Sequence, residues 1–158
     1  MQKQTIARTL LKCYPRYALC IDWHGKYLHR YVEASFGVER NAEQVLEYVI
    51  TRMVKKHQIE LLKNRIDELI SGLPTQQEKL ILSFFVEGID PSDIAAKLEI
   101  HPRTLYKQVD KAIERISKRM WRLHINIPYF NDLISDHKWI HNEYIALTKK
   151  QGHNYVNT

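Results

Sequence analysis

The chain has 158 residues, of which 44% are hydrophobic, so it is long enough to bury a core in one domain or two small ones and is not disordered. Few Gly and Pro disfavour an all-β fold, two cysteines cannot make a disulfide scaffold, and no apolar stretch approaches the ~18 residues that span a bilayer. The formal net charge of +6 suits an acidic partner such as nucleic acid better than a neutral substrate. We expect an all-α, cytoplasmic protein without a membrane partner.

The N-terminal region, residues 1–72, is predicted to be helical. A short helix from Thr5 to Cys13 should stop at Pro15, because proline lacks a backbone donor and disfavours helix before itself. A second helix should follow and end at Phe36-Gly37. Residues 41–70 predict one long helix, or two with a kink, with Asn41 as its N-cap and Gly72 at its C-cap.

Residues 73–124 predict three helices. Thr75 and Glu78 have the spacing of a capping box, and the first helix should run to Val86. Asp90 and Pro91 begin a second helix that ends near Leu98. After a four-residue turn, the third helix runs from about Pro102 to at least Met120. Residues 125–158 predict a C-terminal amphipathic helix, with apolar residues from Phe130 to Ile145, and a polar tail.

A short helix, a tight turn and a longer basic helix form a helix–turn–helix, whose second helix enters the DNA major groove. The motif should have its own apolar core, with a small residue where two helices cross closely. The expected core residues are Leu80, Phe84, Ile94, Ala95, Leu98, Ile100, Leu105, Val109 and Ile113.

Basic residues concentrate on the outer side of the third helix, since residues 101–124 carry seven Lys and Arg against two acidic residues. Base edges are read mostly by the N-terminal part of a recognition helix, which selects Arg103, Thr104, Lys107 and Asp110. Asp110 could instead pair with a cation of the chain. Cations further along the helix are expected to bind phosphates or to be solvated charge: Lys111, Arg115, Lys118, Arg119 and Arg122.

The same segment resembles region 4 of sigma factors. The residues that carry the resemblance are Leu73, Glu78, Glu87-Gly88-Ile89, Ile94-Ala95, Leu98, Ile100, Thr104-Leu105 and Ala112. His101-Pro102 departs from the Ser or Thr usual before the recognition helix. The wider layout, with Leu11 to Pro15 and then a long charged helix, is similar to phage and prophage late-gene regulators of the RinA and ArpU type. That resemblance implies an activator of late genes in a bacterial host, with host RNA polymerase as a further partner.

Other patterns carry less weight. Cys13, Cys20, His24 and His29 lack the spacing of a structural zinc site, and His137 and His141 lack the acid of a His-Glu-x-x-His motif. Aromatic residues between Tyr14 and Tyr31 alternate with cations, but their near-helical spacing favours core packing over base stacking. We expect no metal, no cofactor and no enzymatic activity.

The sequence thus predicts a regulator that binds specific double-stranded DNA. The alternatives are a minimal sigma-like factor that directs RNA polymerase, and a helical interaction protein that does not bind DNA. We also expect a homodimer, because one helix–turn–helix makes few base contacts. Two apolar stripes could join the copies: one on the long helix (Val49, Ile50, Met53, Leu62, Ile66, Leu69) and one from Phe130 to Ile145. Alternatively, the two stripes pack on each other within one chain.

Overall fold

The structure, a computed structural model, describes residues 2–35 and 41–156, with side chains through residue 151. The described residues form seven α-helices and one π-helical turn without a strand, which confirms the all-α fold. The chain divides into two compact units. One comprises Arg16–Asn64, and the other combines Met1–Pro15 with Arg65–Thr158. Among the described helices, none is both long and apolar enough to cross a membrane.

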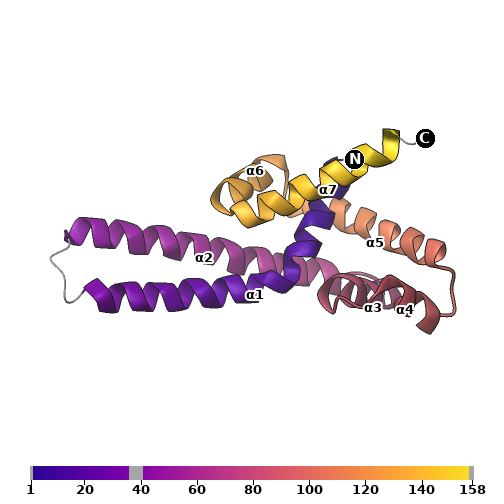
Figure 1. The fold of residues 1–158 in the computed structure, drawn as a ribbon, viewed down its shortest axis with the longest axis horizontal. Coiled ribbons are helices and arrows are strands. Elements are labelled where there is room, and N and C mark those ends of the chain that lie inside the picture. Colours follow the sequence, from indigo (N-terminus) through magenta and orange to yellow (C-terminus); the bar gives the residue numbers. More distant parts are fainter. Residues whose placement is uncertain (1, 36–40, 157–158) are drawn as a thin grey trace. The chain divides into compact units, whose positions relative to one another are not determined.

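The unit Arg16–Asn64 is a helical hairpin, made of residues 16–35 of α1 (Gln2–Ser35) and residues 42–64 of α2 (Ala42–Ser71) lying side by side (Figure 1). Of the two alternatives predicted for residues 41–70, one long helix or two with a kink, the structure has the single helix. Its Asn41 cap is confirmed too, because the side-chain oxygen of Asn41 accepts from the Glu43 backbone N–H at 3.0 Å. The predicted end at Phe36-Gly37 lies outside the described residues.

The predicted break at Pro15 is wrong, since α1 continues through it. Pro15 is exposed, whereas Cys13 and Tyr17 beside it are fully buried. The proline therefore lies on the solvent side of α1, where water can satisfy the carbonyl group that loses its donor. The buried residues of α1 continue past the proline, from Leu10 and Cys13 to Tyr17.

The second unit, here called the main unit, holds α3 (Thr75–Ile81), the π-helical turn η1 (Leu82–Val86), α4 (Pro91–Lys97), α5 (Pro102–Arg122), α6 (Ile127–Asp136) and α7 (Lys138–Val156). Asp90 caps α4 as predicted, but the capping box at Thr75 is wrong. Pro74 precedes α3 and no side chain caps that helix. The C-terminal segment is also corrected: it forms two helices that meet at His137, and the expected polar tail is helical as far as Val156.

The first turns of α1 belong to the core of the main unit. Ile6, Leu10 and Leu11 are at most 1% exposed. Polar contacts join the same turns to α7, through Thr5 to Gln151 at 3.2 Å and Lys12 to Glu143 at 2.5 Å. The N-terminal segment therefore packs with helices that follow it by more than a hundred residues.

Candidate nucleic-acid interface

A tight turn joins α4 to α5. At the start of α4, the Asp90 carboxylate accepts from the Ser92 backbone N–H at 2.8 Å. After α4, Glu99 adopts a φ of 54°, and the Ile100 N–H donates to the Ala95 carbonyl at 3.0 Å. These bonds end one helix and turn the chain within four residues, which is the geometry of a helix–turn–helix.

His101 begins the recognition helix α5. Its Nδ1 atom accepts from the Arg103 backbone N–H at 3.1 Å, and Pro102 occupies the first helical position. An imidazole therefore does what a Ser or Thr hydroxyl usually does at this point. His101 thus replaces the usual Ser or Thr and still provides a capping hydrogen bond.

The motif has a buried core where α3 and α4 pack on α5. The residues expected there and buried are Leu80, Ile94, Ala95, Leu105, Val109 and Ile113. Phe84 and Ile100 are half-buried. Leu98 does not join this core, because it is 49% exposed. It caps the end of α4, where the chain turns, and Ile100 takes the inward position.

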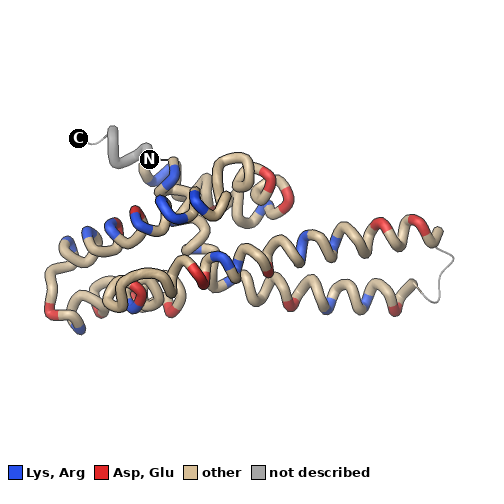
Figure 2. Tube along the Cα trace, turned by 180° about the vertical axis from the view of Figure 1, so that it is seen from behind, with Lys and Arg blue, Asp and Glu red and all other residues tan. Residues whose placement is uncertain are grey.

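The side of α5 opposite this core is basic and exposed, and Figure 2 shows its Lys and Arg residues along the helix. Every residue expected to contact DNA is exposed: Arg103, Thr104, Lys107, Asp110, Lys111, Arg115, Lys118, Arg119 and Arg122. Among the described residues, Arg103, Lys107 and Lys111 form no ion pair. The N-terminal half of α5 thus presents cations whose charge nothing in the described chain neutralises.

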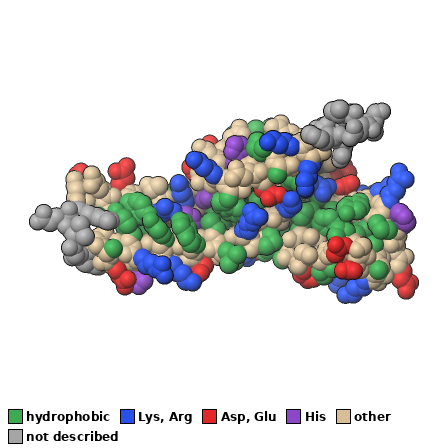
Figure 3. All heavy atoms as spheres, viewed as in Figure 1, with side chains coloured by type: hydrophobic (Ala, Val, Ile, Leu, Met, Phe, Trp, Pro, Cys, Tyr) green, Lys and Arg blue, Asp and Glu red, His purple; other side chains and the backbone are tan. Residues whose placement is uncertain are grey.

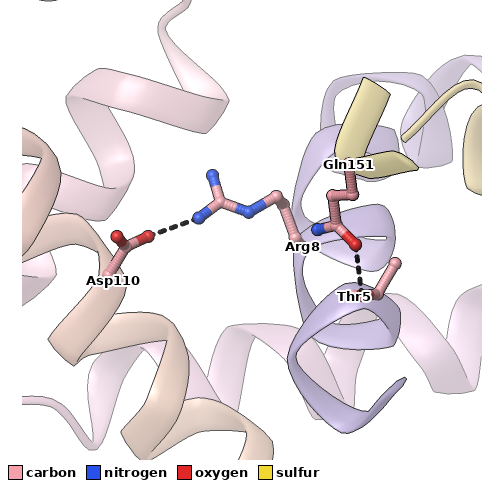
Figure 4. Close-up of polar contacts among 4 residues, drawn as sticks. All are labelled: Thr5, Arg8, Asp110 and Gln151. Carbon is pink, nitrogen blue, oxygen red and sulfur yellow. Dashed lines mark hydrogen bonds and ion pairs between the residues drawn. The ribbon is translucent and has the colours of Figure 1, made fainter. Parts of the chain in front are cut away.

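Asp110 is the exception on this surface. The guanidinium group of Arg8, on α1, forms an ion pair with the Asp110 carboxylate at 2.5 Å (Figure 4). The Asp110 side chain remains 62% exposed, so it is held by Arg8 and still open to solvent. The pair also brings a cation of α1 to the edge of the recognition surface, which lowers the repulsion between this carboxylate and a phosphate backbone.

The four cations in the C-terminal half of α5 gather around a hollow beside the end of α2. The hollow is lined by Gly72, Leu73, Pro74, Arg115, Lys118, Arg119 and Arg122. Lys118 pairs with Glu114 at 2.7 Å, and this hydrogen bond with its charge lowers the pKa of the Glu114 carboxyl. Three guanidinium groups and one ammonium group around one depression suit the oxygen atoms of a phosphate.

Gly72 permits the position of one of these cations. Arg119 donates to the Gly72 carbonyl at 2.7 Å, and a Cβ at residue 72 would clash with the guanidinium group of Arg119 in this position. The glycine that follows α2 therefore leaves space for the guanidinium group. Sequence reasoning assigned this glycine to a helix end and did not find the contact.

Sequence reasoning missed two further residues at or beside the recognition surface, Arg8 and Tyr106. Arg8 lies 102 positions from Asp110, and no local pattern signals such a pair. Tyr106 is 47% exposed near the start of α5, and its ring meets that of Phe84 edge-on at 6.0 Å. The sequence did contain a signal for Tyr106, because an aromatic residue on the outer side of a basic helix is a candidate for contact with DNA.

The aromatic residues of the hairpin contact one another. Trp23 stacks on Tyr27, Tyr31 stacks on Tyr48, and the Arg52 guanidinium lies within 5.4 Å of the ring centres of Trp23, Tyr27 and Tyr48. Trp23 and Tyr27 are 50% and 40% exposed, so these two rings pack on each other and on Arg52 at the surface of the hairpin and not in a core.

One comparison with known proteins, that with family models, agrees with this motif. Residues 63–116 match the family model described as Sigma-70, region 4. No match was found among curated proteins or solved structures. The match runs from the end of α2 into α5 and covers less than half of the chain. The chain therefore carries a helix–turn–helix similar to sigma region 4, which indicates a DNA-binding role in the regulation of transcription.

Proposed function

We propose that the protein regulates transcription by binding a specific sequence of double-stranded DNA, with α5 in the major groove. The main observation that supports this proposal is the exposed N-terminal half of α5. There, Arg103 and Lys107 lie on the side of the helix opposite the helix–turn–helix core. Arg and Lys at this position suit the acceptor atoms of guanine. The match to sigma region 4 supports the same role.

Base reading and phosphate binding are assigned to different parts of α5. Arg103, Thr104, Lys107 and Asp110 read base edges, and Asp110 would accept from a cytosine amine while Arg8 holds it. The cations Lys111, Arg115, Lys118, Arg119 and Arg122 bind phosphates and supply most of the affinity. The hollow beside Gly72 supports the assignment of four of these five cations.

The biological setting is a further part of the proposal. We infer an activator of the phage or prophage late-gene type that works in the cytoplasm of a bacterial host, contacts host RNA polymerase and binds DNA as a homodimer. This rests on the sigma-like motif and the layout of the sequence. A sigma-like factor that directs the polymerase itself is the second candidate, favoured by the same family match. Transcription by core polymerase without a host sigma factor would single it out.

Footprinting on the genomic region that encodes the protein, followed by fluorescence anisotropy, tests DNA binding. Arg103→Ala and Lys107→Ala should each cost ~1–3 kcal/mol on the specific site and relax the choice at one base pair. Lys118→Ala should weaken specific and random duplexes about equally and flatten the salt dependence by about one unit. Equal behaviour of Lys107→Ala and Lys118→Ala would refute the assigned orientation. Absence of affinity for any duplex would leave an interaction protein.

A further inference from the structure

The hairpin exposes many apolar side chains on α2. The large residues Leu46, Ile50, Met53, Val54 and Leu61 are between 42% and 60% exposed. They recur at helical spacing along one side of α2, whereas Leu62, Ile66 and Leu69, which we had expected on the same stripe, are at most 1% exposed. The helix therefore has one buried side and a second, uncovered apolar side.

This uncovered side borders a groove between the two helices. The groove is lined by Leu28 and Val32 of α1 and by Val49, Met53 and Leu61 of α2, among others. Figure 3 shows hydrophobic side chains in a band along the hairpin on the face in view. Two helices alone cannot enclose residues on both of their sides, and exposed apolar surface of this extent marks an interaction site.

Charge is distributed unevenly along the same hairpin. The tip half (residues 28–35 and 42–49) has three Glu and one Arg, whereas the base half (16–27 and 50–64) has six Lys or Arg and two acidic residues. On α2, acidic positions lie near the tip and basic positions further along, as Figure 2 shows. A second hairpin laid antiparallel would place each acidic tip against a basic base, so the net charges of two hairpins complement each other.

We propose that two copies of the chain join through this hairpin surface, as an antiparallel four-helix bundle with the tip of each hairpin against the base of the other. A twofold axis makes such an interface self-complementary, since the same patch serves on both copies. Packing the uncovered side of α2 against its counterpart would bury the apolar residues that one hairpin leaves exposed. The inference rests on the proposed homodimer and adds the surface that joins the copies.

Sedimentation velocity of the full chain at micromolar concentration, without DNA, tests the surface. The unaltered protein should sediment as a species near twice 18.8 kDa. The variant Ile50→Asp with Met53→Asp should be a monomer. Ile145→Asp is the matched control: it replaces an apolar residue on α7 that is 37% exposed, and the dimer should persist. Circular dichroism checks that each variant keeps its helices.

Charge reversal tests the antiparallel arrangement. Reversing the tip (Glu33→Lys with Glu47→Lys) or the base (Lys26→Glu with Lys56→Glu) should each raise the dissociation constant on the order of tenfold at low salt. Combining all four changes in one chain should lower the dissociation constant below that of the tip variant, because a tip of net charge +2 then meets a neutral base instead of a base of net charge +4. Tip-to-tip packing predicts instead that reversing the tip alone leaves the dissociation constant unchanged, because like charges still face each other in both copies, and that result would overturn the arrangement.

The remaining outcomes separate this inference from DNA binding. If the unaltered protein is a monomer that still binds a single half-site, the hairpin interface is overturned and the DNA-binding proposal stands. The occupant of the apolar surface would then be another protein. A dimer that survives Ile50→Asp with Met53→Asp would overturn the assigned surface while self-association stands. Loss of duplex binding by a protein that remains dimeric would refute the proposed function alone.

Discussion

The imidazole of His101 fills a position where Ser, Thr, Asp or Asn is usual. A neutral imidazole has one ring nitrogen free to accept a hydrogen bond, and Nδ1 of His101 uses it for the Arg103 N–H. The sequence showed only that the usual residue was missing. Which nitrogen faces the helix depends on the ring's orientation, which composition and spacing do not fix.

Removing the cap should weaken the recognition helix. His101→Ala leaves the Arg103 N–H without this acceptor, and we expect a loss of ~1 kcal/mol in the free energy of unfolding. His101→Ser should recover most of it, because its hydroxyl can accept the same bond. Urea denaturation of the three proteins provides the measurement. Equal stability of His101→Ala and the parent would show that the hydrogen bond contributes nothing.

The cap of α4 should depend on pH. Hydrogen bonds from the Ser92 hydroxyl and from its backbone N–H lower the pKa of the Asp90 carboxyl. A carboxyl with a lowered pKa in the folded state stabilises the fold above its unfolded pKa of about 3.9, and this contribution disappears as the pH falls through the folded pKa. The stability difference between the protein and Asp90→Ala should therefore be largest near neutral pH and should shrink below about pH 4. A difference that does not change with pH would contradict this role.

Among the helices, the sequence predicted best the starts that carry a local capping signal. Asp90 and Pro91 mark the start of α4, and Asn41 marks that of α2. The meeting of α6 and α7 had no such signal, because Phe130, Leu133, His137 and Ile140 are all buried and their spacing resembles one continuous helix. His137 leaves the helical conformation, with φ −127° and ψ 84°, without interrupting the apolar pattern.

The contact between α4 and α5 gives a matched pair of substitutions. Ala95 is 1% exposed where α4 packs on α5, whereas its neighbour Ala96 is exposed. Ala95→Leu should overpack the crossing and lower the free energy of unfolding by ~1–3 kcal/mol. Ala96→Leu adds the same atoms on the solvent side and should change stability by less than ~0.5 kcal/mol. Thermal or urea denaturation measures both, and similar losses in the two variants would show that the motif is aligned wrongly.

At the scale of the whole molecule, the sequence could predict the motif but not how residues far apart in the chain combine. The region matched to sigma region 4 has a compact pattern of caps, turn and apolar spacing within 63–116. The segment 2–15 joins the main unit through side chains such as Arg8 and Lys12, whose partners lie more than a hundred residues away. Such pairs form only when the fold packs, so the local periodicity of the sequence cannot predict them.

The affinity for DNA also depends on the whole molecule, because two copies can bind together. A single α5 offers few base contacts, so a dimer should gain by engaging two half-sites with one protein, which raises the effective concentration of the second recognition helix. We expect the protein to bind a duplex with two half-sites at least ~10-fold more tightly than a duplex with one.

The variant Ile50→Asp with Met53→Asp should bind both duplexes with the same affinity per half-site, because its recognition helices are unaltered and only the hairpin surface is lost. Anisotropy titrations with the two duplexes supply the four constants. If the variant retains the preference for the double site, the two copies are joined elsewhere; if the parent shows no preference, each chain binds DNA independently.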